Sequence, residues 1–140
     1  MIGAGPSGLA ALKRLRELNI DAECLDREDD LGGNWRFDAA TSRVFASTRL
    51  ISSKSLTAIG DFPMPREFPA YPDHRQCLEY LRAYARTFGL EPHLRYRTDV
   101  ERIEPVGGPG SGWEVRTGGG PPRRYAGGVI ASGQIGRAHV

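Results

Sequence analysis

Six residues near the N-terminus have the types and the spacing of a phosphate-binding turn. Gly3-Ala4-Gly5-Pro6-Ser7-Gly8 has the pattern G-x-G-x-x-G. Gly3 would permit a tight turn, Gly5 would let the backbone approach a pyrophosphate, and Gly8 would let a helix pack closely against a strand. Pro6 suits the first turn of that helix, where no N–H is needed. The pattern predicts backbone N–H groups that face a phosphate; an ordinary strand-to-helix turn is the alternative.

An acid follows at the distance expected for a ribose contact. Asp26 lies 18 residues after Gly8 and ends a short apolar run, close to the offset of about 20 residues at which an acid binds the ribose of a dinucleotide. A carboxylate there accepts hydrogen bonds from both ribose hydroxyls and would repel a 2′-phosphate. The ligand expected at this site is therefore FAD or NAD, not NADP. Without the glycine motif, a solvated surface acid would explain Asp26 equally well.

A second pair of glycines follows the acid. Gly32-Gly33-Asn34-Trp35 comes shortly after Asp26, and the order of glycine turn, acid and paired glycines resembles the extended FAD fingerprint of the glutathione-reductase-like flavoproteins. In that resemblance the pair lets the chain pass close to the pyrophosphate and the flavin, which a plain NAD domain does not need. A flexible loop is the alternative for the glycines, and an ordinary core aromatic is an equal alternative for Trp35.

The glycine turn needs a strand before it and a helix after it. Met1-Ile2 has the character of a strand end, and leucines at every third position, from Leu9 to Leu18, predict a helix over residues 7–18. Asn19 suits the left-handed position that closes a helix. A short strand over residues 22–26 would then present Asp26 at its end.

The rest of the chain predicts one more helix and a series of short strands. Prolines between residues 37 and 72 break regular structure there. Asp73 caps the second helix, with Gln76 completing a capping box, and Gly89 ends it. Short strands follow at 94–97, 100–106, 113–117, 124–125 and 129–131. This order predicts the α/β class: a Rossmann-like parallel sheet of the FAD-binding glutathione-reductase type with an antiparallel β-meander.

Composition excludes several classes of function. The 140 residues are 39% hydrophobic and 26% charged, with a net charge of +2, values that are typical of a globular domain. Because the basic residues are scattered among acids, a nucleic-acid surface is not expected, and no apolar run is long enough for a membrane helix. Cys24 and Cys77 form no C-x-x-C pair and are expected to be buried in a reducing, cytoplasmic environment. His74, His93 and His139 are isolated, and we expect them at the surface or at helix starts, with no metal site.

The motifs together resemble the flavin-containing monooxygenases, the dimethylaniline-monooxygenase-like family. The resemblance spans nearly the whole chain, and GGNW followed by DFPMP is its most specific part. The matching segments are IGAGPSGLAALKRL at 2–15, CLDREDDLGGNW at 24–35, SSK at 52–54, DFPMP at 61–65, FPAYP at 68–72, CLEYLRAYARTFGL at 77–90 and VIASG at 129–133.

The resemblance implies a cofactor, a reaction and a set of binding residues. It implies that reduced flavin reacts with O2 to give a flavin hydroperoxide, which oxygenates a soft nucleophile such as an amine or a sulfide. NADPH would supply the electrons, from a site mostly outside this chain. The implied FAD-binding residues, with Asn34 and Trp35 near the flavin, are Gly3, Gly5, Pro6, Ser7, Gly8, Asp26, Gly33, Asn34, Trp35 and Ser52.

One pair of residues departs from the family pattern. Before the SSK segment the family often carries Thr-Asn, whose side chains lie near the flavin and the nicotinamide. Leu50 and Ile51 stand in those places here and cannot supply the same hydrogen bonds. Flavin binding is expected to survive this change, whereas oxygenation and substrate choice become open questions.

Both ends of the sequence are expected to be incomplete or foreign. Met1-Ile2 is short for a buried strand, which usually has about five or six residues. Residues 134–140 fit no fold element and match one reading frame of a common sequencing adapter. We therefore expect an incomplete FAD-binding domain over residues 1–133, followed by a non-native tail at 134–140, and a chain that is inactive by itself.

Three alternatives to the monooxygenase interpretation stay open. A plain NAD-dependent dehydrogenase half is disfavoured by the Gly32-Gly33 pair and by the meander. A different flavoprotein, such as an amine oxidase or a reductase, is disfavoured by the DFPMP segment. The third alternative is a nucleotide-binding or structural fragment with no catalysis of its own.

Overall fold

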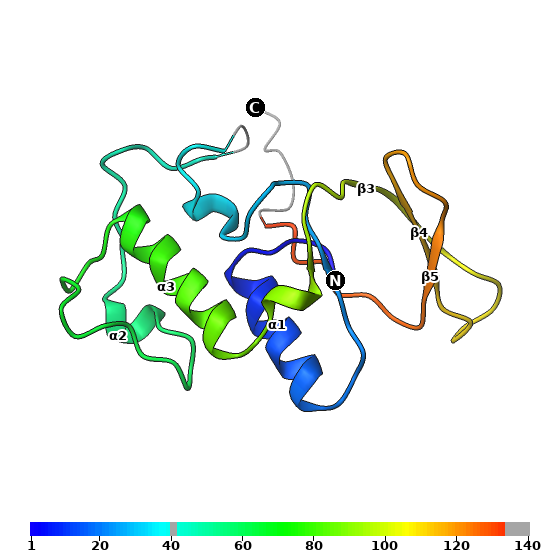
Figure 1. The fold of residues 1–140 in the computed structure, drawn as a ribbon, viewed down its shortest axis with the longest axis horizontal. Coiled ribbons are helices and arrows are strands. Elements are labelled where there is room, and N and C mark those ends of the chain that lie inside the picture. The colour runs from blue at the N-terminus through cyan, green and yellow to red at the C-terminus, as the bar shows by residue number, and fades with distance from the viewer. Residues whose placement is uncertain (40–41, 134–140) are drawn as a thin grey trace.

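The computed structural model describes residues 1–39 and 42–133 and has an α/β architecture (Figure 1). Its helices are α1 (Pro6–Glu17), α2 (Lys54–Thr57) and α3 (His74–Thr87), with 3-10 turns η1 (Gly33–Trp35) and η2 (Glu91–His93). Its strands are β1 (Cys24–Leu25), β2 (Leu94–Arg95), β3 (Val100–Pro105), β4 (Trp113–Thr117) and β5 (Arg123–Tyr125). In this described part, no helix is both long and apolar enough to cross a membrane. The residues predicted to form a non-native tail, 134–140, lie outside the described residues.

A short parallel sheet lies at the centre of the molecule. β1 pairs in parallel with β2, and Ile2 forms parallel bridges to Leu25 on one side and to Ile130 on the other. The segments around residues 130, 2, 25 and 95 therefore lie side by side in that order. Because all four run in the same direction, the turn after Ile2, the loop after Leu25 and the residues after Ile130 emerge at the same edge. This confirms the predicted parallel sheet.

The strands of this sheet are shorter than the sequence predicts. The predicted strand 22–26 is reduced to Cys24–Leu25, and the predicted strand 129–131 to a single bridge at Ile130. Both strands pair with the segment at Ile2, and that segment offers one bridging position because the chain turns at Gly3, where φ is 100°. Ile130 pairs along one side, and its side chain remains 66% exposed.

The second sheet is the predicted antiparallel meander. β3, β4 and β5 pair in that order, with Val115 opposite Ile103 and Arg123. The meander stands apart from the helices, at the right of Figure 1. Val115, in the middle strand, is buried. Residues 100–125 are called the β-meander from here on.

The helices pack on the parallel sheet through a continuous apolar core. Leu9 and Leu12 of α1 and Tyr84 of α3 are almost fully buried, together with Cys24 on the sheet. The predicted ends of both helices are confirmed, because Asn19 has a φ of 57° and the capping box of α3 is complete. In that box, Asp73 Oδ1 accepts from Gln76 N at 2.9 Å and Gln76 Oε1 accepts from Asp73 N at 3.1 Å.

The cysteines and two of the histidines can be placed as well. Cys24 and Cys77 are both free and buried, as predicted. His74 is the first residue of α3, but it is not at the surface, because the Phe37 ring packs 5.1 Å from its centre. His93 lies in η2, and His139 lies outside the described residues.

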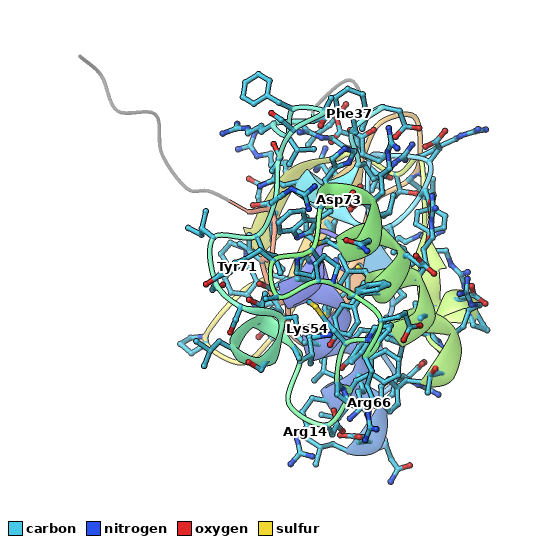
Figure 2. The ribbon with its side chains drawn as sticks, turned by 90° about the vertical axis from the view of Figure 1, so that its left-hand side faces the viewer. Arg14, Phe37, Lys54, Arg66, Tyr71 and Asp73 are labelled. Atoms are coloured by element: carbon cyan, nitrogen blue, oxygen red, sulfur yellow. The ribbon has the colours of Figure 1, made fainter. Side chains whose placement is uncertain are left out.

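The irregular region between Phe37 and Pro72 is organised around one lysine. Lys54, at the start of α2, donates from Nζ to the carbonyl oxygens of Pro65, Arg66 and Phe68 at 3.0, 2.8 and 2.6 Å. Figure 2 labels Lys54 and Arg66 in this region. An ammonium group has three N–H donors, so Lys54 holds the 65–68 loop in place with all of them. This contact connects the SSK, DFPMP and FPAYP segments of the sequence.

Candidate functional site

The glycine turn lies where the parallel sheet meets α1. Gly3 has a φ of 100°, and a Cβ there would stand 2.4 Å from the carbonyl oxygen of Ala131. A Cβ on Gly8 would stand 1.8 Å from the carbonyl oxygen of Gly3. Real Cβ atoms do not approach backbone oxygens this closely, so both positions require glycine. Gly8 therefore brings α1 against the first strand, as its place in the motif predicts.

The second glycine pair packs against the first turn. Gly32 N donates to the carbonyl oxygen of Ala4 at 2.9 Å. Gly33 has a φ of 55°, and a Cβ there would stand 3.1 Å from the Cα atom of Gly5. The two glycine-rich segments thus touch through their backbones, and Gly5 and Gly33 leave the space beside them free of side chains.

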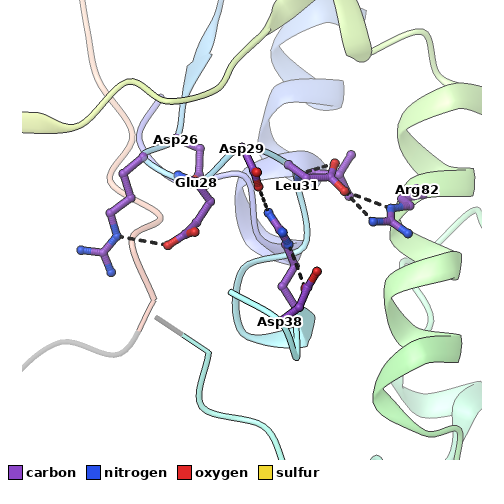
Figure 3. Close-up of polar contacts among 9 residues, drawn as sticks. Asp26, Glu28, Asp29, Leu31, Asp38 and Arg82 are labelled. Atoms are coloured by element: carbon purple, nitrogen blue, oxygen red, sulfur yellow. Dashed lines mark hydrogen bonds and ion pairs between the residues drawn. The ribbon is translucent and has the colours of Figure 1, made fainter. Parts of the chain in front are cut away.

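Asp26 is joined directly to the glycine turn. Its Oδ2 accepts a hydrogen bond from Ala4 N at 2.6 Å, and its Oδ1 accepts one from Glu28 N at 2.9 Å. The carboxylate is partly exposed at the start of the loop that leads to Gly32 (Figure 3). The predicted ribose acid and the predicted phosphate-binding turn therefore form one structural unit, at the edge where the parallel strands end.

A cavity of about 480 Å³ opens beside this unit. This volume lies within the range of sites that bind small molecules and cofactors. Eight of the ten predicted site residues line it, and they are Gly3, Gly5, Pro6, Ser7, Asp26, Gly33, Asn34 and Trp35.

The two remaining predicted site residues lie elsewhere. Gly8 is buried behind the turn, where its role is to let α1 approach the strand. Ser52 is exposed outside the cavity lining, and its hydroxyl pairs with that of Thr57 at 2.6 Å. The two residues that replace the family's Thr-Asn pair also separate, because Leu50 is buried in the core and Ile51 is fully exposed.

The cavity has a wall that the sequence patterns did not indicate. Thr98, Asp99 and Val100 line it on one side and Ala131–Gly133 on another, with Arg43 as a further lining residue. Thr98 N donates to the carbonyl oxygen of Asp26 at 2.8 Å. The sequence did contain an indication of this wall, because Thr98 and Asp99 closely follow a predicted strand. Ligands of open α/β sheets bind beyond the carboxyl ends of the parallel strands.

Ion pairs hold the loop between Asp26 and Phe37 (Figure 3). Arg36 is almost buried and donates from Nη1 to Asp29. This hydrogen bond lowers the pKa of the Asp29 carboxyl from its ordinary value. Arg82 of α3 contacts Asp30 Oδ2 at 2.6 Å. One contact lies within the loop and the other joins the loop to α3, and together they fix the position of the second glycine pair.

Neither a metal-binding cluster nor an exposed cysteine is found among the described residues. No group of three or more His, Cys, Asp or Glu side chains among them could hold a metal ion. Burial raises the pKa of the Cys24 thiol to about 11 and that of the Cys77 thiol to about 12, so neither is a ready nucleophile at neutral pH.

Comparison with known proteins identifies the family. The fold is a mixed α/β architecture that matches part of a solved steroid monooxygenase. The flavin-binding monooxygenase-like family matches residues 1–120. The chain therefore belongs to the flavin-binding monooxygenase-like family and is homologous to the flavin-containing monooxygenases.

Individual relatives agree with this assignment. Flavin-containing monooxygenase 5 of Oryctolagus cuniculus is 37% identical over 123 residues, which are 84% of this chain and 23% of the rabbit protein. The solved flavin-containing monooxygenase from Stenotrophomonas maltophilia is 28% identical, with a TM-score of 0.74 over 88% of this chain and 34% of that one. An oxidized steroid monooxygenase bound to NADP has the same fold, with 24% identity and a TM-score of 0.80 over 99% of this chain and 26% of that one. The chain thus spans about a quarter to a third of these relatives.

Proposed function

We propose that the cavity beside the glycine turn binds FAD, with the pyrophosphate over residues 3–8 and the adenosine ribose against Asp26. The observation that carries this proposal is the 2.6 Å hydrogen bond from Ala4 N to Asp26 Oδ2, which joins the ribose acid to the phosphate-binding turn. Each carboxylate oxygen accepts one backbone N–H. A carboxylate has about four acceptor positions, so capacity remains for two ribose hydroxyls.

Residues of this chain would bind and orient the cofactor. Backbone N–H groups at the start of α1 bind the pyrophosphate, aided by the positive end of the helix dipole. Gly5 and Gly33 keep side chains away from it. Asn34 and Trp35, which also line the cavity, would contact the flavin side and limit the access of water. Ser52 would reach the cofactor only after a movement of residues 50–53, since it lies outside the lining.

The reaction we infer for the complete enzyme is the NADPH-dependent transfer of one oxygen atom from O2 to a soft nucleophile, an amine or a sulfide. When bound, the flavin supplies the redox chemistry and the reaction with O2, while the protein supplies position and a dry pocket. The family assignment supports this reaction, and the steroid monooxygenase of the same fold is bound to NADP. The NADPH contacts would lie mostly in the length of the relatives that this chain does not match.

A titration with FAD tests the binding proposal. Purified chain is titrated with FAD, and the quenching of flavin fluorescence gives the dissociation constant. Asp26→Ala should weaken binding by about tenfold or more, because hydrogen bonds to a charged acceptor are lost. Asp21→Ala is the matched control, since Asp21 is a fully exposed acid near the same strand. Equal affinity of Asp26→Ala and Asp21→Ala would overturn the proposal, and binding of NAD without FAD would favour the dehydrogenase alternative.

A further inference from the structure

Glu23 connects the β-meander to the parallel sheet. It lies directly before β1, and its Oε1 accepts hydrogen bonds from the Tyr125 hydroxyl and, at 3.3 Å, from Arg123 Nη1. Its Oε2 lies 3.3 Å from Arg95 Nε of β2. One carboxylate thus holds two residues of β5 and one residue of the neighbouring parallel strand. Glu23 is the shielded member of these ion pairs, because 22% of its side chain is exposed, against 52% for Arg95 and 60% for Arg123.

The other junction between the two sheets is small and apolar. A cavity of about 70 Å³ remains between them, so the packing there is incomplete. Side chains from both sheets line it, and they include Ile103, Val115 and Tyr125 from the β-meander and Ile2, Leu25 and Ile130 from the parallel sheet. Incomplete apolar packing specifies position weakly, which leaves the Glu23 contacts as the directional connection.

The β-meander begins and ends at the wall of the proposed FAD site. Thr98, Asp99 and Val100 lead into it and line the large cavity, and Ala131–Gly133, just after it, line the same cavity. Thr98 and Ala131 are held by the parallel sheet, because Thr98 N donates to the carbonyl oxygen of Asp26 and Ala131 N to that of Ile2, each at 2.8 Å. Asp99 and Val100 are held by the β-meander, because the carbonyl oxygen of Asp99 accepts from Gly118 N at 3.1 Å and Val100 begins β3. A displacement of the β-meander would therefore move Asp99 and Val100, which line the cavity.

We infer that Glu23 is a positioning residue for the cofactor site: by holding Tyr125, Arg123 and Arg95 together, it fixes the β-meander and with it the part of the wall formed by Asp99 and Val100. This inference rests on the proposed FAD site. Glu23 itself is outside the cavity lining, so it acts through the β-meander and not by touching the cofactor. The groups that face it are Arg95, Arg123, Tyr125 and the N-terminal amine, which donates to the Glu23 carbonyl oxygen.

A graded series of variants tests the inference by FAD affinity. Glu23→Gln keeps the shape and one acceptor for the Tyr125 hydroxyl but loses the charge, whereas Glu23→Ala loses both. We expect FAD to bind roughly threefold to tenfold more weakly to Glu23→Ala, with Glu23→Gln in between as a partial rescue. Tyr125→Phe, the mildest change, should weaken binding less, and its effect should largely disappear in the Glu23→Ala background. Glu67→Gln, at an exposed glutamate away from both sheets, is the matched control.

A spectroscopic signal reports the β-meander directly. Of the two tryptophans, Trp113 lies on β4 and lines the small apolar cavity. In a Trp35→Phe background without FAD, the Trp113 emission of Glu23→Ala should shift to longer wavelength than that of its parent. The helical signal in far-UV circular dichroism, which comes mainly from α1 and α3, should stay unchanged. This control separates a displaced β-meander from general unfolding.

The outcomes distinguish this inference from the proposed function. If the unmodified chain does not bind FAD, the proposed function fails, whatever Trp113 does. If the chain binds FAD and Glu23→Ala binds it equally well, or if Glu23→Ala weakens binding with no change in Trp113 emission, the positioning role of Glu23 is refuted. Weaker binding with a shifted Trp113 emission and partial rescue by Glu23→Gln supports it.

Discussion

The carbonyl oxygen of Gly3 occupies the place that a side chain at Gly8 would need. An ideal Cβ on Gly8 would lie 1.8 Å from that oxygen, which is backbone and cannot rotate away. The close contact between the first strand and α1 thus depends on the absence of one carbon atom. Because Ala4, in the same turn, donates from its N–H to Asp26 Oδ2, the shape of the proposed FAD site depends on this contact too.

Gly8→Ala is therefore expected to destabilise the chain by roughly 3 kcal/mol, the upper range for forcing extra atoms into a packed interior. The free energy of unfolding in urea measures the effect. Gly60→Ala is the control, since among the described residues no heavy atom lies within 4 Å of a Cβ built there. That variant should stay within about 0.5 kcal/mol of the unmodified chain. Equal stabilities of the two variants would contradict the close contact.

Lys54→Met should loosen the loop that Lys54 holds. The variant loses three hydrogen bonds to the carbonyl oxygens of residues 65–68. Trypsin cleavage after the exposed Arg66 then becomes about fivefold faster or more, because local opening costs at least 1 kcal/mol less. Glu101→Gln, at an exposed glutamate outside the loop, should leave the rate unchanged. Cleavage of Lys54→Met at the unmodified rate would show that Lys54 does not hold the loop.

Acid should destabilise the fold in a defined pH range. Hydrogen bonds lower the pKa values of four carboxyl groups. Arg36 donates to Asp29, Lys13 donates to Asp61 and Glu17, and backbone N–H groups at the start of α3 donate to Asp73. Since a lowered folded-state pKa means that the unfolded chain binds protons first, the stabilisation is complete above the ordinary carboxyl values near pH 4 and is lost as the pH falls further. Urea midpoints measured from pH 7 to pH 3 should stay level and then fall. A midpoint that rises below pH 4 would contradict these contacts.

The two cysteines should react slowly while the chain is folded. With thiol pKa values raised to about 11 at Cys24 and about 12 at Cys77, the thiolate fraction at pH 8 is very small. A reagent that releases a coloured product when it reacts with a thiol measures the reaction, with and without denaturant. We expect both thiols to react at once in denaturant and to be protected without it. Rapid reaction of one thiol in the folded chain would contradict the burial of that cysteine.

Much of the fold could be predicted because its signals are local. Leucine spacing marked α1, the Asp73–Gln76 box marked the start of α3, and the turn-forming glycines separated β3, β4 and β5. Strand lengths could not be predicted, because they depend on where the chain leaves its neighbour. The burial of His74 was also beyond local signals, since it depends on Phe37, which is distant in sequence.

The candidate site divides in the same way. The residues of contiguous motifs line the cavity: Gly3, Gly5, Pro6 and Ser7 from the first and Gly33, Asn34 and Trp35 from the second. Thr98 and Ala131–Gly133 reach it through the order of the parallel strands, whereas Asp99 and Val100 reach it through the placement of the β-meander. That placement involves the contact of Glu23 with Tyr125, two residues far apart in the sequence. Ser52 belongs to a motif, yet the fold directs it away from the cavity.

Competition between nucleotides tests the central claim most directly. ADP contains the adenine, ribose and pyrophosphate that residues 3–8 and Asp26 are proposed to hold, whereas FMN contains the flavin without them. ADP should displace bound FAD, which the flavin fluorescence follows. When Asp26→Ala is loaded with FAD to the same fractional saturation as the unmodified chain, about tenfold more ADP should be needed for the same displacement. If residues 3–8 and Asp26 hold the adenosine and pyrophosphate of FAD, FMN should bind far more weakly than FAD. Failure of ADP to displace FAD, together with FMN binding as tightly as FAD, would contradict it.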